Sequence, residues 1–179
     1  KGFAISKLTY DDHALEQNID VAGGYPHSIQ VIGHNLVEVD RDGKIGADDW
    51  TSALMKSAAE MARKEFSDLY DFKGKGTLRE TVLNVLALAQ RPMTKQELRD
   101  AVGGKNIYTA TCMGELKKTG AVSEIADGSI ILHSMLFRAA ILIHLYTHAD
   151  KNPAYQEQIQ KFAPPHEDST LSSSKGILK

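Results

Sequence analysis

The chain has 179 residues, a formal net charge of −2 and 42% hydrophobic residues, which is enough for one ordinary domain or two small ones. The near-neutral charge argues against wholesale wrapping of nucleic acid but leaves room for a local basic face. The single cysteine, Cys112, excludes a disulfide framework and fits a reducing compartment, so we expect a cytoplasmic protein. The longest apolar run, around Met135 to Leu145, contains Arg138 and His144 and is too short to cross a bilayer, which predicts no membrane partner.

The first seventy residues have the apolar spacing of three helices. These predicted helices cover residues 11–22, 26–39 and 48–70. Gly23-Gly24 ends the first helix, Pro26 begins the second, and Asp48 is the predicted N-cap of the third. Together they form a first predicted unit, residues 1–71, and the glycine- and lysine-rich segment 72–76 is a predicted linker.

The loop at residues 37–50 has the acidic spacing of a calcium site and resembles the loops of EF-hand and dockerin modules. The candidate oxygen ligands are Glu38, Asp40, Asp42 and Asp49. The pattern departs from such loops because its first ligand is Glu, its last is Asp, and no second copy follows. A turn around Gly43 and capping of the next helix explain the same carboxylates. We therefore predict no metal site and keep a calcium-binding adaptor as a minor alternative.

A second group of elements begins at Thr77. T-x-x-E capping boxes open two predicted helices, at Thr77 and Thr94. A third helix is predicted over residues 106–120, and Asp127-Gly128 is a strong turn signal between two short β-rich runs. Three helices followed by a hairpin are the order of a winged helix.

An amphipathic helix is predicted after the hairpin, over residues 134–150, and the second predicted unit extends over 77–162. Pro, Ser and Thr become frequent from residue 163 onward, so we predict a mobile tail over 163–179. The predicted fold class is mainly α, with a three-helix unit, a winged helix and an extra C-terminal helix.

The third helix of the predicted winged helix offers side chains that suit DNA. The candidate DNA contacts are Lys105, Asn106, Tyr108, Thr109, Thr111, Lys117 and Lys118. The predicted inward face of this helix is Ile107, Ala110, Met113 and Leu116. The wing is acidic at Glu124 and Asp127, however, and winged helices also dock proteins. Duplex DNA and a protein partner therefore both remain open.

Two further groups could carry chemistry. His144 and His148 lie four residues apart on one predicted helix and could share a metal, although surface or partly buried histidines explain the same spacing. Cys112 fits a buried thiol better than a nucleophile, because no base has a recognisable relation to it. We therefore predict no catalytic residue in this chain.

A series of short motifs links the helices of the first unit. A glycine pair ends the first helix, Gly24-Tyr25-Pro26 forms a G-x-P motif that opens the second, and Ile45 and Asp49 form an I-x-x-x-D motif at the third. This series, over about residues 8–60, resembles the helical lid of AAA+ ATPases in the branch related to origin-recognition proteins. In that branch a winged helix commonly follows the lid, as residues 77–135 would here.

The resemblance implies that a nucleotide-binding domain precedes the lid, and Lys1 in place of an initial Met fits a piece of a longer protein. That missing domain would bind ATP and Mg²⁺. No G-x-x-x-x-G-K-[ST] loop occurs in these 179 residues. We therefore expect this chain alone not to be catalytic and the parent protein to be an ATPase.

Many such lids carry an arginine directly after the proline, where it senses the nucleotide phosphates. The residue here is His27, which is a weaker and titratable partner for phosphate. The candidate nucleotide-sensing residues implied by the resemblance are Gly24, Tyr25, Pro26 and His27. An exposed histidine without this role is the alternative.

These patterns together predict the C-terminal part of an AAA+ ATPase. Its lid would pack on the missing nucleotide-binding domain, and its winged helix would bind DNA or a protein partner. The main alternative is a standalone winged-helix DNA-binding regulator with an N-terminal helical dimerisation domain.

Overall fold

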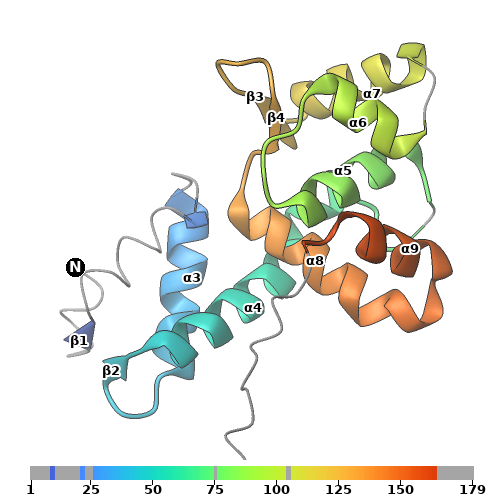
Figure 1. The fold of residues 1–179 in the computed structure, drawn as a ribbon. Coiled ribbons are helices and arrows are strands. Elements are labelled where there is room, and N and C mark those ends of the chain that lie inside the picture. Colours follow the sequence, from blue (N-terminus) through green and yellow to red (C-terminus); the bar gives the residue numbers. More distant parts are fainter. Residues whose placement is uncertain (1–8, 11–20, 23–25, 75, 104–105, 165–179) are drawn as a thin grey trace, which may run out of the picture.

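The computed structural model of the chain describes residues 9–10, 21–22, 26–74, 76–103 and 106–164. This part is mainly helical with a small antiparallel strand pair, which confirms the predicted mainly α class. Figure 1 shows two helices from the first half of the chain joined to a larger helical group from the second half.

The first two described helices, α3 (Pro26–Val39) and α4 (Ala47–Lys64), pack against each other. Their buried side chains, which include those of Ile32 and Met61, belong to the hydrophobic core. The loop between them contains the strand β2 (Lys44–Ile45), which pairs in parallel with β1 (Thr9–Tyr10). This pairing ties the beginning of the chain to the loop at the start of α4.

The third predicted helix, 48–70, is divided in the structure. Helix α4 ends at Lys64, and the 3-10 helix η1 (Phe66–Asp68) follows it. The turn at Glu65 lets the side chains of Phe66 and Tyr70 enter the core. Residues 11–20 of the first predicted helix lie outside the described part of the chain, and residues 21–22 are helical.

The second half follows the predicted order of elements. It contains α5 (Leu78–Ala89), α6 (Lys95–Val102), α7 (Asn106–Lys118), β3 (Val122–Glu124) and β4 (Ile130–Leu132). Thr94 caps α6, and Glu97 accepts a hydrogen bond from the Thr94 N–H at 2.8 Å, which confirms that capping box. Thr77 also caps α5, but Glu80 accepts from the Gly76 N–H at 2.8 Å instead of from Thr77. The box predicted at Thr77 is therefore wrong in its second half, because the buried Glu80 turns toward the preceding segment.

The segment between α5 and α6 pairs with the hairpin through a single antiparallel β-bridge. Met93 and Ile130 exchange two backbone hydrogen bonds, of 2.9 and 2.7 Å. The hairpin turns at Gly128, whose φ of 82° favours glycine, and the Gly128 N–H donates to the Ile125 carbonyl. The turn predicted at Asp127-Gly128 is confirmed.

The chain ends its described part with α8 (Met135–His148), the 3-10 helix η2 (Ala149–Lys151) and α9 (Pro153–Phe162). Helix α9 was not predicted, although its start is visible in the sequence. Asn152 caps it by accepting from the Ala154 N–H at 3.2 Å, and Pro153 occupies the first helical position. Residues 165–179 of the predicted tail lie outside the described part.

The two predicted units are in contact rather than held apart. Helix α4 packs against α8, as Figure 1 shows, and the rings of Phe66 and Phe137 lie 4.9 Å apart at this junction. A methyl group on Gly74, in the predicted linker, would come within 2.7 Å of the Tyr155 hydroxyl in α9. The linker therefore lies against the second unit. The division into two separately folding units stays a prediction.

Candidate functional site

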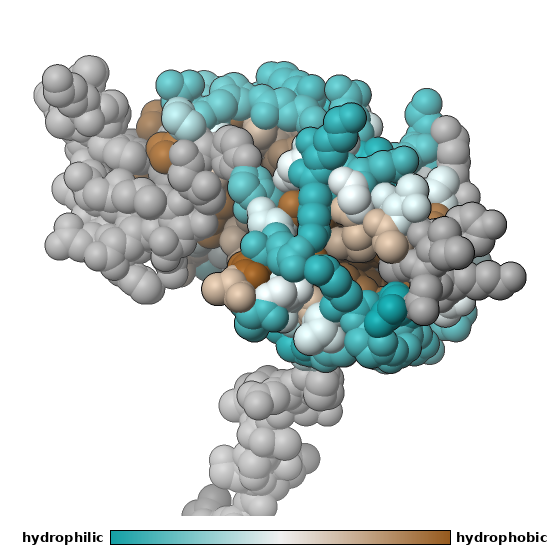
Figure 2. Space-filling view, turned by 90° about the horizontal axis from the view of Figure 1, so that it is seen from above, coloured by the Kyte–Doolittle hydropathy of each residue, from teal (hydrophilic) through white to brown (hydrophobic). Residues whose placement is uncertain are grey.

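Of the predicted DNA-contacting residues, all but Lys105 belong to α7, which packs against α5 and contacts β3 of the hairpin (Figure 1). Lys105 lies outside the described residues, and so do the side chains of Asn106, Tyr108 and Thr109, although these three belong to α7. Thr111 and Lys118 are exposed, and Lys117 is half-buried. Figure 2 shows that hydrophilic residues cover most of the described surface when the molecule is seen from above.

The buried face of α7 differs from the predicted one. Met113 and Leu116 are buried as predicted, but Ala110 is exposed and Cys112 is buried. The prediction for Ala110 was wrong because the buried face of α7 passes through Cys112, Met113 and Leu116, and Ala110 lies outside it. Cys112 is buried, as predicted, and this burial raises the pKa of its thiol.

Glu124, at the end of β3, is paired with two of the basic side chains around α7. It accepts hydrogen bonds from Lys95 of α6, at 2.8 Å, and from Lys117 of α7. These two ammonium groups hold the pKa of Glu124 down to about 2. The charge of Lys117 is therefore matched within the protein rather than offered to a phosphate.

The predicted nucleotide-sensing residues lie at the start of α3. Gly24 and Tyr25 lie outside the described residues, and Pro26 is the first residue of the helix. His27 is exposed, and its Nε2 lies 2.7 Å from Glu65 Oε1, just beyond the end of α4. A phosphate at this position would have to compete with Glu65 for the imidazole. Sequence reasoning missed Glu65, since nothing local relates it to His27.

Three of the four carboxylates predicted for the acidic loop accept hydrogen bonds from the loop's own backbone, whereas Glu38 pairs with His34 and Lys56. Asp40 accepts from the Gly43 N–H at 3.1 Å, and Asp42 accepts from the Lys44 N–H at 2.9 Å. Asp49 accepts from the N–H of Gly46 at 3.0 Å. Within the described residues, no group of three or more His, Cys, Asp or Glu side chains is placed to hold a metal. These hydrogen bonds fit the turn-and-cap interpretation of the loop.

The predicted N-cap of α4 needs correction. Gly46 occupies that position, and Asp48 lies in the first turn of the helix instead. Its carboxylate is still favourable there, because the N-terminus of a helix carries partial positive charge.

A buried polar cluster that the sequence did not predict lies where α5, α8 and α9 meet. The Tyr155 hydroxyl donates to Glu80 Oε1 at 2.6 Å and lies 3.3 Å from His144 Nε2. Burial, with a smaller contribution from His148, lowers the pKa of His144 to about 4, so this ring is neutral at neutral pH. His148 Nδ1 lies 2.9 Å from the His144 carbonyl oxygen. Both histidines therefore have partners within the protein; His144 is buried and His148 is exposed.

A second chain of hydrogen bonds extends this cluster. The Tyr70 hydroxyl donates to Asn84 Oδ1 at 2.8 Å, and Asn84 Nδ2 donates to Gln158 Oε1 at 2.9 Å. A signal for Asn84 was present in the sequence, because it is a polar residue inside the apolar run V-L-N-V-L of a helix. No local signal identified its partners.

Comparisons with known proteins add no relative. No protein-family model, curated protein or solved structure matches the chain significantly. In the part of the chain that the structure describes, no helix is both long and apolar enough to cross a membrane.

Proposed function

We propose that the chain is the C-terminal part of an AAA+ ATPase. Residues 1–71 would form a helical lid on the nucleotide-binding domain, and residues 77–162 would form a winged helix that docks a partner. The observation that carries this proposal is the order of elements, in which the α3–α4 pair is followed by three helices and a hairpin. The parent protein would bind ATP and Mg²⁺ in the cytoplasm, and this chain alone would not be catalytic.

Two local features support the lid. Ile45 is 2% exposed, so the first position of the I-x-x-x-D motif anchors the loop in the core. The last position, Asp49, holds the N–H of Gly46 at the start of α4. The motif therefore has a physical role here, which is to fix where α4 begins.

The backbone bridge between Met93 and Ile130 supports the winged helix. A winged helix adds a short strand before its second helix to the hairpin that forms the wing. Met93 directly precedes α6 and pairs with β4, which is the place such a strand would occupy.

The charge pattern around α7 favours a protein partner over tight DNA binding. DNA affinity depends on basic side chains that neutralise phosphates. Lys95 and Lys117 are already paired with Glu124, whereas Lys118 is exposed. We therefore propose protein docking as the main role of this surface and weak, salt-sensitive duplex binding as the second candidate.

The reading frame upstream of Lys1 tests the ATPase proposal. We expect it to encode a G-x-x-x-x-G-K-[ST] loop followed by an acidic metal-binding strand. The longer protein should bind ATP with Mg²⁺, and nucleotide should slow amide hydrogen exchange at the start of α3. Replacing the lysine of that loop with alanine should abolish both effects. A frame with no phosphate-binding loop would overturn the proposal in favour of a standalone regulator.

A further inference from the structure

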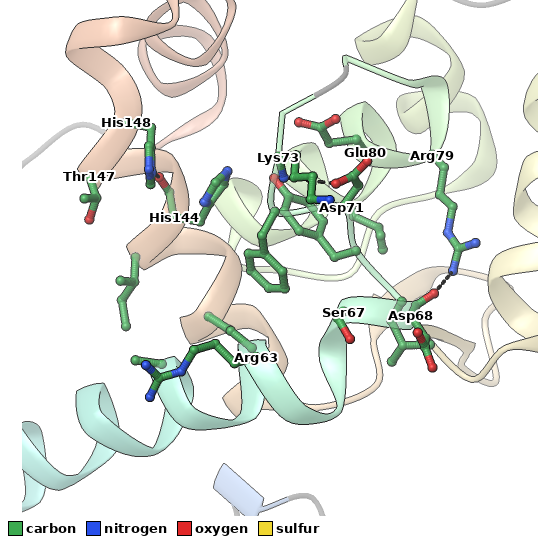
Figure 3. A pocket seen from close by; sticks show the side chains of 18 of the residues that line it. Arg63, Ser67, Asp68, Asp71, Lys73, Arg79, Glu80, His144, Thr147 and His148 are labelled. Carbon is green, nitrogen blue, oxygen red and sulfur yellow. Dashed lines mark hydrogen bonds between the residues drawn. The ribbon is translucent and has the colours of Figure 1, made fainter.

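A pocket of about 870 Å³ lies at the junction of the two predicted units, as seen in Figure 3. This volume is within the usual range for small-molecule sites. Its walls come from α4, from the segment that leads into the linker, from α5 and from α8. It is separate from the His27 position and from the predicted DNA face of α7.

Small side chains create the hollow between α4 and α8. Ala59 and Ala62 face it from α4, and Ala140 faces it from α8. The two helices are in contact along the junction, so short side chains at these places leave space that larger ones would fill. Ile143 and Leu83 complete an apolar wall.

Aromatic rings form the inner side of the pocket. His144, which is 9% exposed, lies with its ring edge-on to Tyr70 and Phe72, at centroid distances of 5.8 and 5.4 Å. Because burial keeps His144 uncharged at neutral pH, this surface suits an apolar or aromatic body rather than a charged group.

The charged residues of the pocket are unevenly placed. Glu80 already accepts from Tyr155 and from the Gly76 N–H, and Asp71 accepts from the Lys73 N–H at 3.0 Å. Asp68 lies beside Arg79, which donates to its carbonyl oxygen at 3.2 Å. In Figure 3 these three carboxylates lie on the linker and α5 side.

The opposite end of the pocket carries two hydrogen-bond donors, the Arg63 guanidinium group and the Thr147 hydroxyl, whereas His148 uses its Nδ1–H on the His144 carbonyl oxygen. Arg63 extends from α4, and Thr147 and His148 belong to the facing helix α8. All three residues are exposed, and Figure 3 places no labelled carboxylate among them. An anionic group at this end would meet a guanidinium group and a hydroxyl.

We propose that this pocket binds a small organic anion. Its aromatic or aliphatic body would lie against His144 and Phe72, and its carboxylate, sulfonate or phosphate group would bind Arg63 at the α4–α8 end. Such a ligand would touch both predicted units at once, so its binding would stabilise their junction.

Anilinonaphthalene sulfonate is a suitable probe, because it joins an aromatic body to a permanent negative charge. We expect saturable binding at one site of the full chain, followed by fluorescence. The backbone amide shifts of Ala62, Ile143 and Thr147 should change. Naphthylmethylammonium, which has a similar ring and the opposite charge, should bind at least about tenfold more weakly.

Two variants that lose the same charge test whether Arg63 binds the anionic group of the probe. Arg63→Gln should weaken binding of the sulfonate about tenfold, as expected for the loss of one charge-assisted hydrogen bond. Lys64→Gln removes the same charge from the next residue, which pairs with Glu60 at 2.6 Å and does not line the pocket, and it should leave binding unchanged. Thr147→Trp should block the exposed rim without filling the core.

Three results would overturn the proposal. They are equal binding of the anionic and cationic probes, equal effects of Arg63→Gln and Lys64→Gln, and amide shift changes that map away from α4 and α8. Thermal melting of each variant shows whether it is folded, so a loss of binding by an unfolded variant is not counted as support.

Discussion

Tyr155 joins three helices through one hydroxyl group. It donates to Glu80 of α5 and lies beside His144 of α8. Burial, together with the nearby Glu80, raises the pKa of Tyr155, so the phenol keeps its proton and remains a donor. A buried carboxyl group is costly unless hydrogen bonds satisfy it, and Tyr155 supplies such a bond to Glu80.

Tyr155→Phe should therefore destabilise the protein by about 1–3 kcal/mol, because it removes the donor and leaves Glu80 Oε1 without it. The free energy of unfolding in urea measures this change. Tyr146→Phe removes the same atom from a side chain that is 50% exposed and should have almost no effect. Equal losses in the two variants would show that the buried hydrogen bond is not what stabilises this region.

Gly74 and Gly76 form a second matched pair, since their φ angles are 69° and 66°. Alanine at either place should cost about 1 kcal/mol through the left-handed backbone alone. Gly74→Ala should cost clearly more, because the new methyl group would meet the Tyr155 hydroxyl at 2.7 Å, whereas nothing lies within 4 Å at Gly76. Chemical denaturation compares the two variants. A larger loss for Gly76→Ala would contradict the close packing of the linker on α9.

The buried His144 predicts a pH dependence of stability. It titrates near 6.5 in an unfolded chain and at about 4 in the folded protein, where it is packed against Tyr155 and His148, with Asp71 nearby. Between these values the unfolded chain binds more protons, so the free energy of unfolding should fall as the pH falls. We expect the free energy of unfolding to fall by about 1–2 kcal/mol between these two pH values. This is less than the full shift in the pKa of His144 implies, because His144 lines an open pocket. Denaturation at several pH values should show a flatter profile for His144→Gln; an unchanged profile would assign the effect elsewhere.

At the scale of the elements, Glu124 ties the hairpin to two helices. Its carboxylate holds Lys95 at the start of α6 and Lys117 near the end of α7. The carboxylate of Glu124 in the hairpin therefore neutralises two lysines of the surface that would face DNA. This pairing is the reason that we expect weak DNA binding by the end of α7.

Glu124→Gln should release both lysines and strengthen binding to duplex DNA. Two additional phosphate contacts would steepen the dependence of log affinity on log salt by up to about 2. Fluorescence anisotropy at low salt measures both effects. Asp127→Asn makes the same change in net charge but frees no lysine, because Asp127 accepts from the Ser129 N–H in the turn. If both variants bind DNA as the unaltered chain does, the surface has no DNA role and docking remains.

Signals between neighbouring residues predicted most helices and turns, but they did not predict how these elements pack against one another. The caps at Thr77 and Thr94 and the turn at Gly128 depend on neighbouring residues, and each was visible in the sequence. The second half of the Thr77 box was wrong because Glu80 is drawn into a bond with Tyr155, which lies 75 residues away. The predicted face of α7 was wrong at Ala110, because the buried face passes through Cys112, Met113 and Leu116.

The candidate sites were harder to predict than the elements. A sequence can indicate that Lys117 is basic, but it cannot indicate that Glu124 neutralises it across a turn. The same limit applies to His27, whose partner Glu65 is at the far end of the neighbouring helix. Pairing between side chains that are distant in the sequence depends on tertiary packing, which cannot be predicted from a single sequence.

At the scale of the whole molecule, the contact between α4 and α8 makes the two predicted units share a core. The linker at residues 72–76 predicts two separately folding units, whereas the shared core leads us to expect one cooperative unfolding transition. Trp50, the single tryptophan, reports on the first unit, and amide signals of the hairpin report on the second. Both signals should change at the same denaturant concentration.

Phe137→Leu, which loosens the contact with Phe66, should lower the free energy of unfolding reported by both signals by about 1–2 kcal/mol. Transitions that separate in the unaltered chain would show instead that each unit folds independently.

The bond between Tyr155 and Glu80 also bears on how the protein is made. During synthesis α5 leaves the ribosome before the α9 partners of Glu80 and Asn84, which follow 75 and 74 residues later. The apolar residues of α5 are exposed for the same interval, because α8 has yet to cover them. The nascent chain therefore exposes these side chains of α5 for a long part of synthesis. During that time a chaperone would find more surface to bind than on the folded protein.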